Sequence, residues 1–262
     1  TTTPNQKLEQ VKMFGGNAIE ILLHGDTFDD AADAALNYCQ SEGLSFIHPF
    51  NDCKVIEGQG TVGKEILAQS KRPLDYIFVP VGGGGLAAGV ASYVKTHSPK
   101  TKIIGVEPEG APSLLTALKF GSPVKLDQVD KFIDGASVKE IGSLNFNYCQ
   151  ALLDDVITVP EGAVCTTILE LYNKDAIVVE PAGALALTGA CNYCIPKNAE
   201  VAIVLSGSNN DITRMEEIKE RSLLHEKLKH YFLVSFPQRS GALKDFVNDV
   251  LGPNDDITLF EY

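Results

Sequence analysis

The most distinctive chemical feature of the 262-residue sequence is a run of four glycines, Gly82–Gly85, directly after the apolar segment Tyr76–Val81. A glycine costs about 0.5–1 kcal/mol relative to alanine in a folded segment. Four consecutive glycines therefore indicate a structural or functional reason for their presence. Bare backbone N–H groups between a strand and a helix bind anions, and the helix dipole adds to the attraction. The run therefore predicts a phosphate-binding turn, with a tightly packed turn as the alternative.

Three kinds of phosphate ligand compete for this turn. A nucleotide P-loop requires Gly-Lys-Ser/Thr after the run, and Gly85-Leu86-Ala87 does not supply it. The residues from Gly83 to Ala88 fit the dinucleotide pattern G-x-G-x-x-A, and Glu107 ends the next predicted strand, where a ribose-binding acid would lie. That pattern usually opens its domain, whereas three predicted strands precede it in this sequence. A single phosphate, as in pyridoxal 5′-phosphate (PLP), is the third candidate.

The elements that must position the turn alternate between strands and helices. The predicted strands are 18–23, 44–50, 76–81, 102–107, 156–159 and 201–205. The predicted helices are 7–14, 27–40, 61–69, 86–95, 161–172 and 182–193. Strands separated by helices indicate parallel βαβ units and therefore an α/β fold with a doubly wound, mostly parallel sheet.

The pattern changes after residue 211. A charged helix over 213–229 leads to a strand over 231–237, a helix over 241–251 and a strand over 256–262. Two strands and one helix bury too little apolar surface to be stable alone, so we expect part of this domain to be missing.

Composition excludes several classes of function. Acidic residues outnumber basic ones by 34 to 22, giving a net charge of −12, which disfavours nucleic-acid binding. No apolar stretch approaches the roughly 20 residues of a membrane helix, and the first residues lack the apolar core of a signal peptide. Six scattered cysteines do not form a disulfide framework, and Cys191 and Cys194 are expected to be packing thiols. We expect a cytoplasmic protein.

Seven short motifs extend along the chain to about residue 214. They are Thr3-Pro4, Gly58–Thr61, Gly82–Gly85, Gly105–Pro108, Asp134–Ala136, Glu180–Ala184 and Ser206–Asn210. Most are weak individually, but in this order they resemble the fold type II PLP-dependent threonine/serine dehydratases, most closely the biosynthetic threonine deaminases. The resemblance implies PLP as the cofactor and an amino acid as the substrate.

The resemblance also assigns roles to particular residues. It implies that the backbone amides of Gly82, Gly83, Gly84, Gly85 and Leu86 bind the PLP phosphate. Ser206 would face the pyridine nitrogen, where a neutral hydroxyl leaves the ring less strongly protonated and favours β-elimination. Gly135 and Glu180 would lie near the ring. From the sequence alone, Ser206 is equally compatible with a cap after a buried strand.

A cation site is implied more loosely. Glu107, the carbonyl of Ala111 and Ser113 match positions at which relatives hold a monovalent or divalent cation with oxygen ligands. The alternative for Glu107 is a carboxylate in an exposed loop.

Two further features concern the extent of the chain. Phe236–Leu243 resembles the opening of the ACT-like (ferredoxin-like) regulatory domain that senses isoleucine in this family, but only about half of that domain is present. The family's Schiff-base lysine lies in a Lys-x-Arg-Gly-Ala segment before an Asn-His loop, and the sequence contains neither an Arg-Gly nor an Asn-His dipeptide. We therefore expect a chain truncated at both ends that contains no catalytic residue and is inactive by itself.

The expected function of the parent protein is deamination of L-threonine to 2-oxobutanoate and ammonia in isoleucine biosynthesis, in a homo-oligomer. The alternatives are a serine dehydratase or racemase-like PLP enzyme, a non-catalytic fragment, and an NAD(P)-binding enzyme. The expected domains are the remainder of a small subdomain (1–49), a large PLP-binding domain (50–212), a linker helix (213–229) and half of the regulatory domain (230–262).

Overall fold

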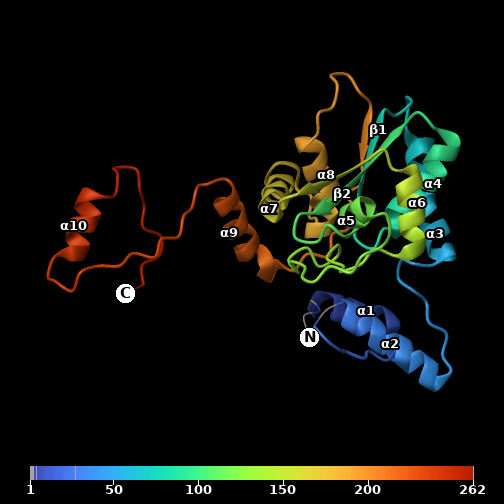
Figure 1. Cartoon of the computed structure of the whole chain (residues 1–262), viewed down its shortest axis with the longest axis horizontal. Helices are drawn as coiled ribbons and strands as arrows, with labels where there is room; N and C mark the ends of the chain where they lie inside the picture. The colour runs from blue at the N-terminus through green and yellow to red at the C-terminus, as the bar shows by residue number, and fades with distance from the viewer. Residues whose placement is uncertain (1–2, 4, 27, 262) are drawn as a thin grey trace. The chain divides into compact units, whose positions relative to one another are not determined.

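The computed structural model describes residue 3 and residues 5–26 and 28–261. Residues 1–2, 4, 27 and 262 lie outside this part, so Pro4 of the first motif, the first residue of the second predicted helix and the last residue of the final predicted strand are not considered further. The chain forms two compact units, Thr1–Leu228 and Lys229–Tyr262, and each is described separately (Figure 1). The finer predicted division of the first unit stays a prediction.

A four-stranded parallel sheet forms the centre of the first unit, in the order β3-β2-β1-β4. The strands are β1 (Tyr76–Pro80), β2 (Lys102–Pro108), β3 (Asp155–Val159) and β4 (Val201–Ile203). All five residues of β1 are buried, as expected for a central strand covered on both faces. The predicted α/β fold with a parallel sheet is confirmed.

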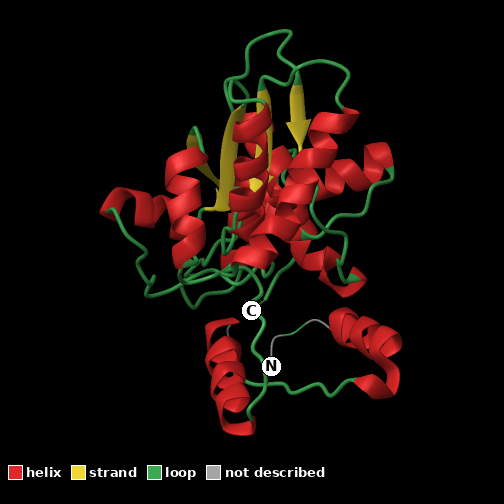
Figure 2. Ribbon diagram, turned by 90° about the vertical axis from the view of Figure 1, so that its right-hand side faces the viewer, coloured by secondary structure: helices red, strands yellow, loops and turns green. Residues whose placement is uncertain are grey.

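Helices cover both faces of the sheet (Figures 1 and 2). Ile77 and Val79 of β1 pack in a core with α3 (Cys53–Gln69), α4 (Gly85–His97), α5 (Ser113–Phe120) and α6 (Ser143–Leu152). Tyr76 and Phe78 point to the other face and pack with α7 (Glu161–Glu170), α8 (Pro181–Asn192) and α9 (Met215–His225). Successive side chains of a strand point to opposite faces, so one apolar strand supplies both cores.

Helix α3 begins eight residues before the predicted start because Asp52 caps it. The Asp52 carboxylate accepts hydrogen bonds from the backbone N–H groups of Lys54 at 2.8 Å and Val55 at 3.2 Å. Helices α5 and α6 lie where the sequence pattern predicts no element. The other helices are α1 (Asn5–Gly15), a 3-10 turn (Gly16–Ala18), α2 (Phe28–Glu42), a π-helical turn (Leu171–Asp175) and a 3-10 turn (Ile212–Arg214).

Replacing Asp52 with alanine is expected to lower the free energy of unfolding by about 1 kcal/mol, because two N–H groups at the start of α3 lose their acceptor. Urea denaturation of the Asp52→Ala variant measures this loss. The control is Glu57→Ala, an exposed position on the same helix, which should change stability little. Equal stability of Asp52→Ala and wild type would contradict the cap.

Two strands predicted before the sheet do not form. Residues 19–23 and 44–48 have no regular secondary structure, and no described strand pairs with them. A strand is stable only when its N–H and C=O groups bond to a neighbour, and apolar patterning alone does not supply one. Leu22 and Ile47 are accordingly exposed.

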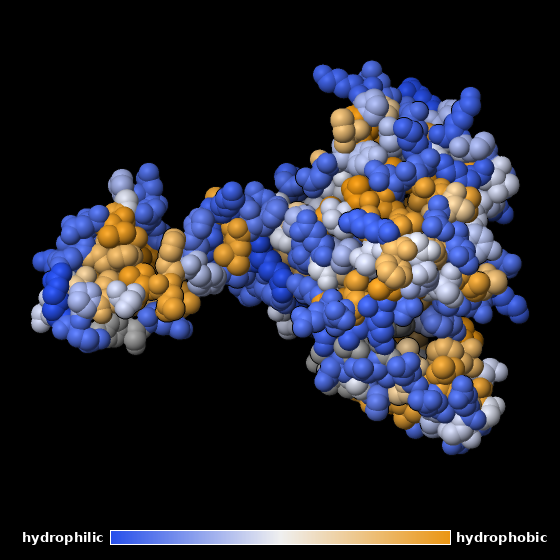
Figure 3. Space-filling model, viewed as in Figure 1, coloured by the Kyte–Doolittle hydropathy of each residue, from blue (hydrophilic) through white to orange (hydrophobic). Residues whose placement is uncertain are grey.

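Among its described residues, the second unit contains one regular element, α10 (Ala242–Asp249), close to the predicted helix. The predicted strands over 231–237 and 256–262 are absent from the described residues. In a ferredoxin-like fold, the two strands of a βαβ unit are separated by another strand, so neither can pair with the other. Their apolar residues, including Phe232 and Leu233, are exposed, and Figure 3 shows hydrophobic side chains at the surface of this unit.

Within the described residues, no helix combines the length and apolar character needed to cross a membrane.

Candidate functional site

A cavity of about 340 Å³ in the first unit lies beyond the carboxyl ends of β1 and β4. In parallel α/β sheets, this end of the strands is where ligands bind. The cavity brings together all eight residues that the sequence suggests for the cofactor. Its lining consists of Pro49, Phe50, Val55, Gln59, Pro80, Gly82, Gly83, Gly84, Gly85, Leu86, Gly135, Ala136, Glu180, Ala182 and Ser206.

The glycine run forms the turn from β1 into α4. Gly84 is the N-cap of α4 and has a φ of +86°, a left-handed conformation that favours glycine. The run carries no side chain that would occupy the space in front of the first N–H groups of α4. A Cβ atom on Gly83 would lie 2.5 Å from Cδ1 of Phe50. The turn is therefore a bare backbone surface at a helix N-terminus, which fits the phosphate of PLP.

Ser206 and Glu180 also line the cavity. Ser206 follows β4 and is exposed to the cavity, whereas Glu180 is the N-cap residue of α8. The backbone N–H of Glu180 donates to the carbonyl of Gly207 at 3.0 Å, which joins the start of α8 to the Ser206 loop. Burial raises the pKa of the Glu180 carboxyl; Lys7 opposes this, Asp134 adds to it, and Arg214 opposes it.

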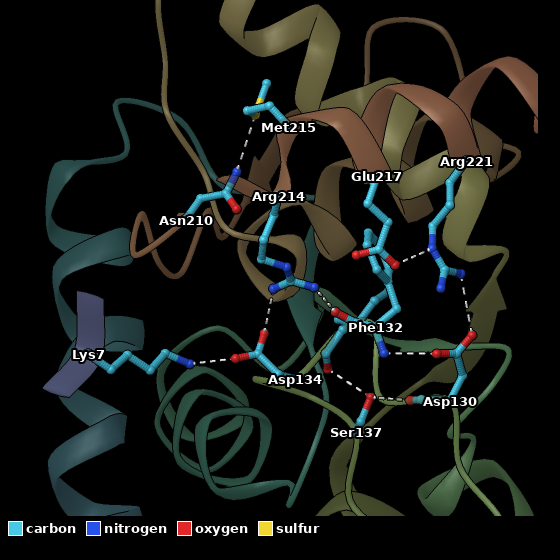
Figure 4. A network of polar contacts seen from close by, with 11 residues as sticks. Lys7, Asp130, Phe132, Asp134, Ser137, Asn210, Arg214, Met215, Glu217 and Arg221 are labelled. Carbon is cyan, nitrogen blue, oxygen red and sulfur yellow. Dashed lines mark hydrogen bonds and ion pairs between the residues drawn. The ribbon is translucent and has the colours of Figure 1, made fainter. Parts of the chain in front are cut away.

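A polar network holds the loop that carries Gly135 (Figure 4). The Asp134 carboxylate forms ion pairs with Lys7 of α1 at 2.7 Å and with Arg214 at 3.3 Å. Arg214 also donates a 2.6 Å hydrogen bond to the carbonyl of Phe132. These contacts tie the 132–136 loop to two segments far away in sequence. Asp134 belongs to one of the sequence motifs, but only the tertiary contacts show that it anchors this loop.

Helix α9 contributes a third cation to this loop, Arg221. The guanidinium of Arg221 lies 4.2 Å from the ring centre of Phe132, and that of Arg214 lies 5.1 Å from it. Arg221 also pairs with Asp130 at 3.5 Å and with Glu217 at 2.9 Å (Figure 4). Cation–π contacts of this kind contribute about 0.5–2 kcal/mol. The loop at the cavity is therefore anchored to α9 by both charge and stacking.

Glu107 occupies a different place from the cavity. Its side chain is completely buried and accepts hydrogen bonds from the N–H groups of Leu114 at 2.7 Å and Leu115 at 2.8 Å, and from the Ser113 hydroxyl at 3.3 Å. It thus caps α5, and the alternative of an exposed loop carboxylate is wrong. Burial raises the pKa of the Glu107 carboxyl to about 7, against the lowering effect of these hydrogen bonds.

This arrangement bears on two predictions. Glu107 and Ser113 are in contact, and the N–H of Ser113 donates to the carbonyl of Ala111 at 3.0 Å, so the three candidate cation ligands lie close together where β2 leads into α5. Both Glu107 oxygens already accept backbone N–H groups, and the cation site stays a prediction. No group of three or more His, Cys, Asp or Glu side chains in the described part of the chain is arranged to hold a metal ion. The same bonds turn Glu107 toward α5, which disfavours a ribose-binding role.

The chain is similar to known proteins over its whole length. Residues 1–207 match the family described as "Pyridoxal-phosphate dependent enzyme", and residues 220–262 match "C-terminal regulatory domain of Threonine dehydratase". The biosynthetic L-threonine dehydratase of Halalkalibacterium halodurans is 53% identical over 263 residues, covering 100% of this chain and 63% of that protein. That of Staphylococcus saprophyticus is 54% identical over 266 residues with the same coverage.

Two solved structures show the same likeness in three dimensions. The processed form of threonine deaminase isoform 2 from Solanum lycopersicum has a TM-score of 0.78 and 41% identity, covering 85% of this chain and 64% of its own. Maize serine racemase has a TM-score of 0.74 and 29% identity, covering 86% and 69%. The chain spans 63% of the length of the curated relatives that it matches.

Proposed function

Because the chain belongs to the pyridoxal-phosphate dependent enzymes, we propose that the protein of which it forms part deaminates L-threonine to 2-oxobutanoate and ammonia. The observation that carries the proposal is the single cavity into which the glycine turn, Gly135, Glu180 and Ser206 converge. The chain shares 53% and 54% sequence identity with two biosynthetic L-threonine dehydratases, which supports the choice of substrate. The reaction would provide the first step of isoleucine biosynthesis.

The residues of the cavity suit binding and orientation of the cofactor. Bound PLP supplies an electron sink that stabilises negative charge at the α-carbon of an amino acid. The N–H groups of Gly82–Leu86 would bind its phosphate at the start of α4, and the Ser206 hydroxyl would face the ring nitrogen. A hydroxyl does not carry the negative charge that would hold a proton on that nitrogen, which favours elimination of a β-substituent over transamination. Gly135 and Glu180 would lie beside the ring.

This chain supplies the binding surface and not the base. The sequence has no Lys-x-Arg-Gly-Ala segment, so no lysine here matches the one that the family uses to bind PLP covalently and to move the α-proton. We therefore expect the 262-residue chain by itself not to turn over threonine.

The second unit supports a proposal on regulation. Residues 220–262 match a regulatory domain of threonine dehydratase, and we propose isoleucine, the end product, as the effector of the whole protein. We also propose that the whole protein is a cytoplasmic homo-oligomer, in keeping with the resemblance to its family.

The test is to incubate the full-length protein with PLP and L-threonine and to follow formation of a 2-oxoacid. We expect 2-oxobutanoate and ammonia in equal amounts, with slower turnover of L-serine. Turnover of serine but not threonine would favour the serine-specific alternative suggested by the likeness to maize serine racemase. Turnover of a nicotinamide dinucleotide without release of a 2-oxoacid from either amino acid would contradict the proposal. The 262-residue chain serves as the inactive control.

A further inference from the structure

The side chain of Asn145, on α6, contacts the glycine turn but does not line the cavity. It is completely buried, and its Nδ2 donates to the carbonyl of Gly83 at 2.6 Å and to the carbonyl of Phe50 at 3.0 Å. Gly83 and Phe50 both line the cavity, whereas Asn145 does not. One amide group therefore connects two segments that line the cavity.

The bond to Gly83 has a consequence for the next residue. The C=O of Gly83 and the N–H of Gly84 belong to the same trans peptide group and point in opposite directions. Since the C=O points toward Asn145, the N–H of Gly84 points away from it. Because Gly84 lines the cavity and Asn145 does not, we infer that this N–H faces the cavity. The N–H of Gly142 adds a longer bond of 3.3 Å to the same Gly83 carbonyl.

This peptide group needs such a constraint because glycines lie on both sides of it. Without Cβ atoms on Gly83 and Gly84, rotation of the whole peptide meets little steric resistance. A rotated peptide would direct a carbonyl oxygen, instead of an N–H group, at a bound anion. The turn would then repel the phosphate that it is suited to bind.

The chemistry of Asn145 indicates that its two donors are what the site requires. Its Oδ1 is buried and accepts no hydrogen bond from the described residues. A buried polar atom without a partner is unfavourable, and an apolar side chain at this position would avoid that cost. The NH2 group is therefore the reason for an asparagine at this position. Because its two neighbours are carbonyl oxygens, the NH2 end of the amide faces them and the Oδ1 end does not.

We propose that Asn145 is a positioning residue that locks the Gly83–Gly84 peptide in the orientation that presents its N–H to the cofactor phosphate. This inference rests on the proposed PLP site and adds a residue that no motif of the sequence indicates. Asn145 acts through the peptide and not by contact with the cofactor. Its loss is therefore expected to weaken the contacts of the phosphate, whereas those of the ring with Gly135, Glu180 and Ser206 stay in place.

The experiment compares two ligands that differ only by the phosphate. The affinities of the full-length protein, freed of cofactor, for PLP and for pyridoxal are measured for wild type and for Asn145→Leu. We expect PLP affinity to fall about 10- to 100-fold, the range for one hydrogen bond to a charged group, with pyridoxal affinity unchanged. Asn145→Asp keeps the shape of the side chain but cannot donate two hydrogen bonds. It should therefore also lower the ratio of PLP affinity to pyridoxal affinity.

The matched control is Asn51→Leu. Asn51 contacts the start of the same helix, accepting from the N–H of Leu144 at 2.9 Å and donating to Ser143 at 3.4 Å, but it makes no described hydrogen bond to the glycine turn. It should leave the ratio of PLP to pyridoxal affinity at the wild-type value.

Three results would overturn the inference. Equal loss of both affinities in the Asn145 variants would show a general structural role, and no loss of either would show that the peptide keeps its orientation without Asn145. If the wild-type protein itself bound PLP no better than pyridoxal, the phosphate site of the proposed function would fail, and this inference with it. The wild-type measurement thus distinguishes failure of the proposed function from failure of the inference alone.

Discussion

Replacing Gly89 with alanine is expected to lower the free energy of unfolding by about 3 kcal/mol, the upper part of the range for overpacking a closed interface. A Cβ atom on Gly89 would contact the carbonyl oxygen of Ile56 and would lie 2.6 Å from the backbone nitrogen of Gly60. Both belong to the backbone of α3, which cannot move aside as a flexible side chain could. Helices α3 and α4 would have to separate, and the core beneath them would lose contacts.

Urea denaturation of the full-length protein measures this effect, and α3 itself provides the control. Gly58 also lies within α3, but a Cβ atom there meets nothing within 4 Å. Gly58→Ala should therefore stabilise the protein by about 0.5–1 kcal/mol, since alanine favours the helix. The two substitutions are thus expected to change the free energy of unfolding in opposite directions. If Gly89→Ala unfolded at the same urea concentration as wild type, the close approach of α3 and α4 would be refuted.

Replacing Gly82 with alanine is expected to weaken PLP binding by about 100-fold, which corresponds to the upper part of the energy range for overpacking a closed contact. A Cβ atom on Gly82 would lie 2.8 Å from Cα and 3.2 Å from the carbonyl oxygen of Ala136. The glycine turn would have to move away from the 132–136 loop. That loop is anchored by the ion pairs of Asp134 with Lys7 and Arg214, so the glycine turn is the part expected to yield.

The measurement is the PLP affinity of the full-length variant, freed of cofactor, with its thermal unfolding recorded in parallel. Unlike the Asn145 variants, Gly82→Ala should weaken PLP and pyridoxal together, because the cavity changes shape as a whole. Gly58→Ala again serves as the control and should bind PLP as wild type does. Wild-type affinity in Gly82→Ala would show that the two walls do not approach each other as described.

The sequence predicted the sheet well because its strands are coded locally. The four strands that form are short apolar runs next to turn signals. The central strands β1 and β2 are buried on both faces, which leaves such runs few other structures. Residues 18–23 and 44–50 have similar apolar character but do not form strands. Strand formation depends on a neighbour with free N–H and C=O groups, and the apolar pattern of one segment does not report whether a neighbour exists.

The candidate site divides in the same way. The glycine turn can be found from sequence, because four glycines after an apolar run are unfavourable unless the backbone itself is used. Asn145 and Arg214 cannot be found so, since an asparagine and an arginine in helical segments are ordinary surface residues. Their roles arise from what they reach: a carbonyl 62 residues away for Asn145, and a carbonyl 82 residues away for Arg214.

By itself, then, the sequence determined the α/β fold, the glycine turn and the order of motifs that leads to the family, because all of these depend on residues close together in the chain. The tertiary structure decided that Gly82–Leu86, Gly135, Glu180 and Ser206 share one cavity, and that Glu107 caps α5 outside it. The physical reason is that hydrogen bonds, ion pairs and close backbone contacts act over a few ångströms. Which distant segments come within that range is settled only when the chain is folded.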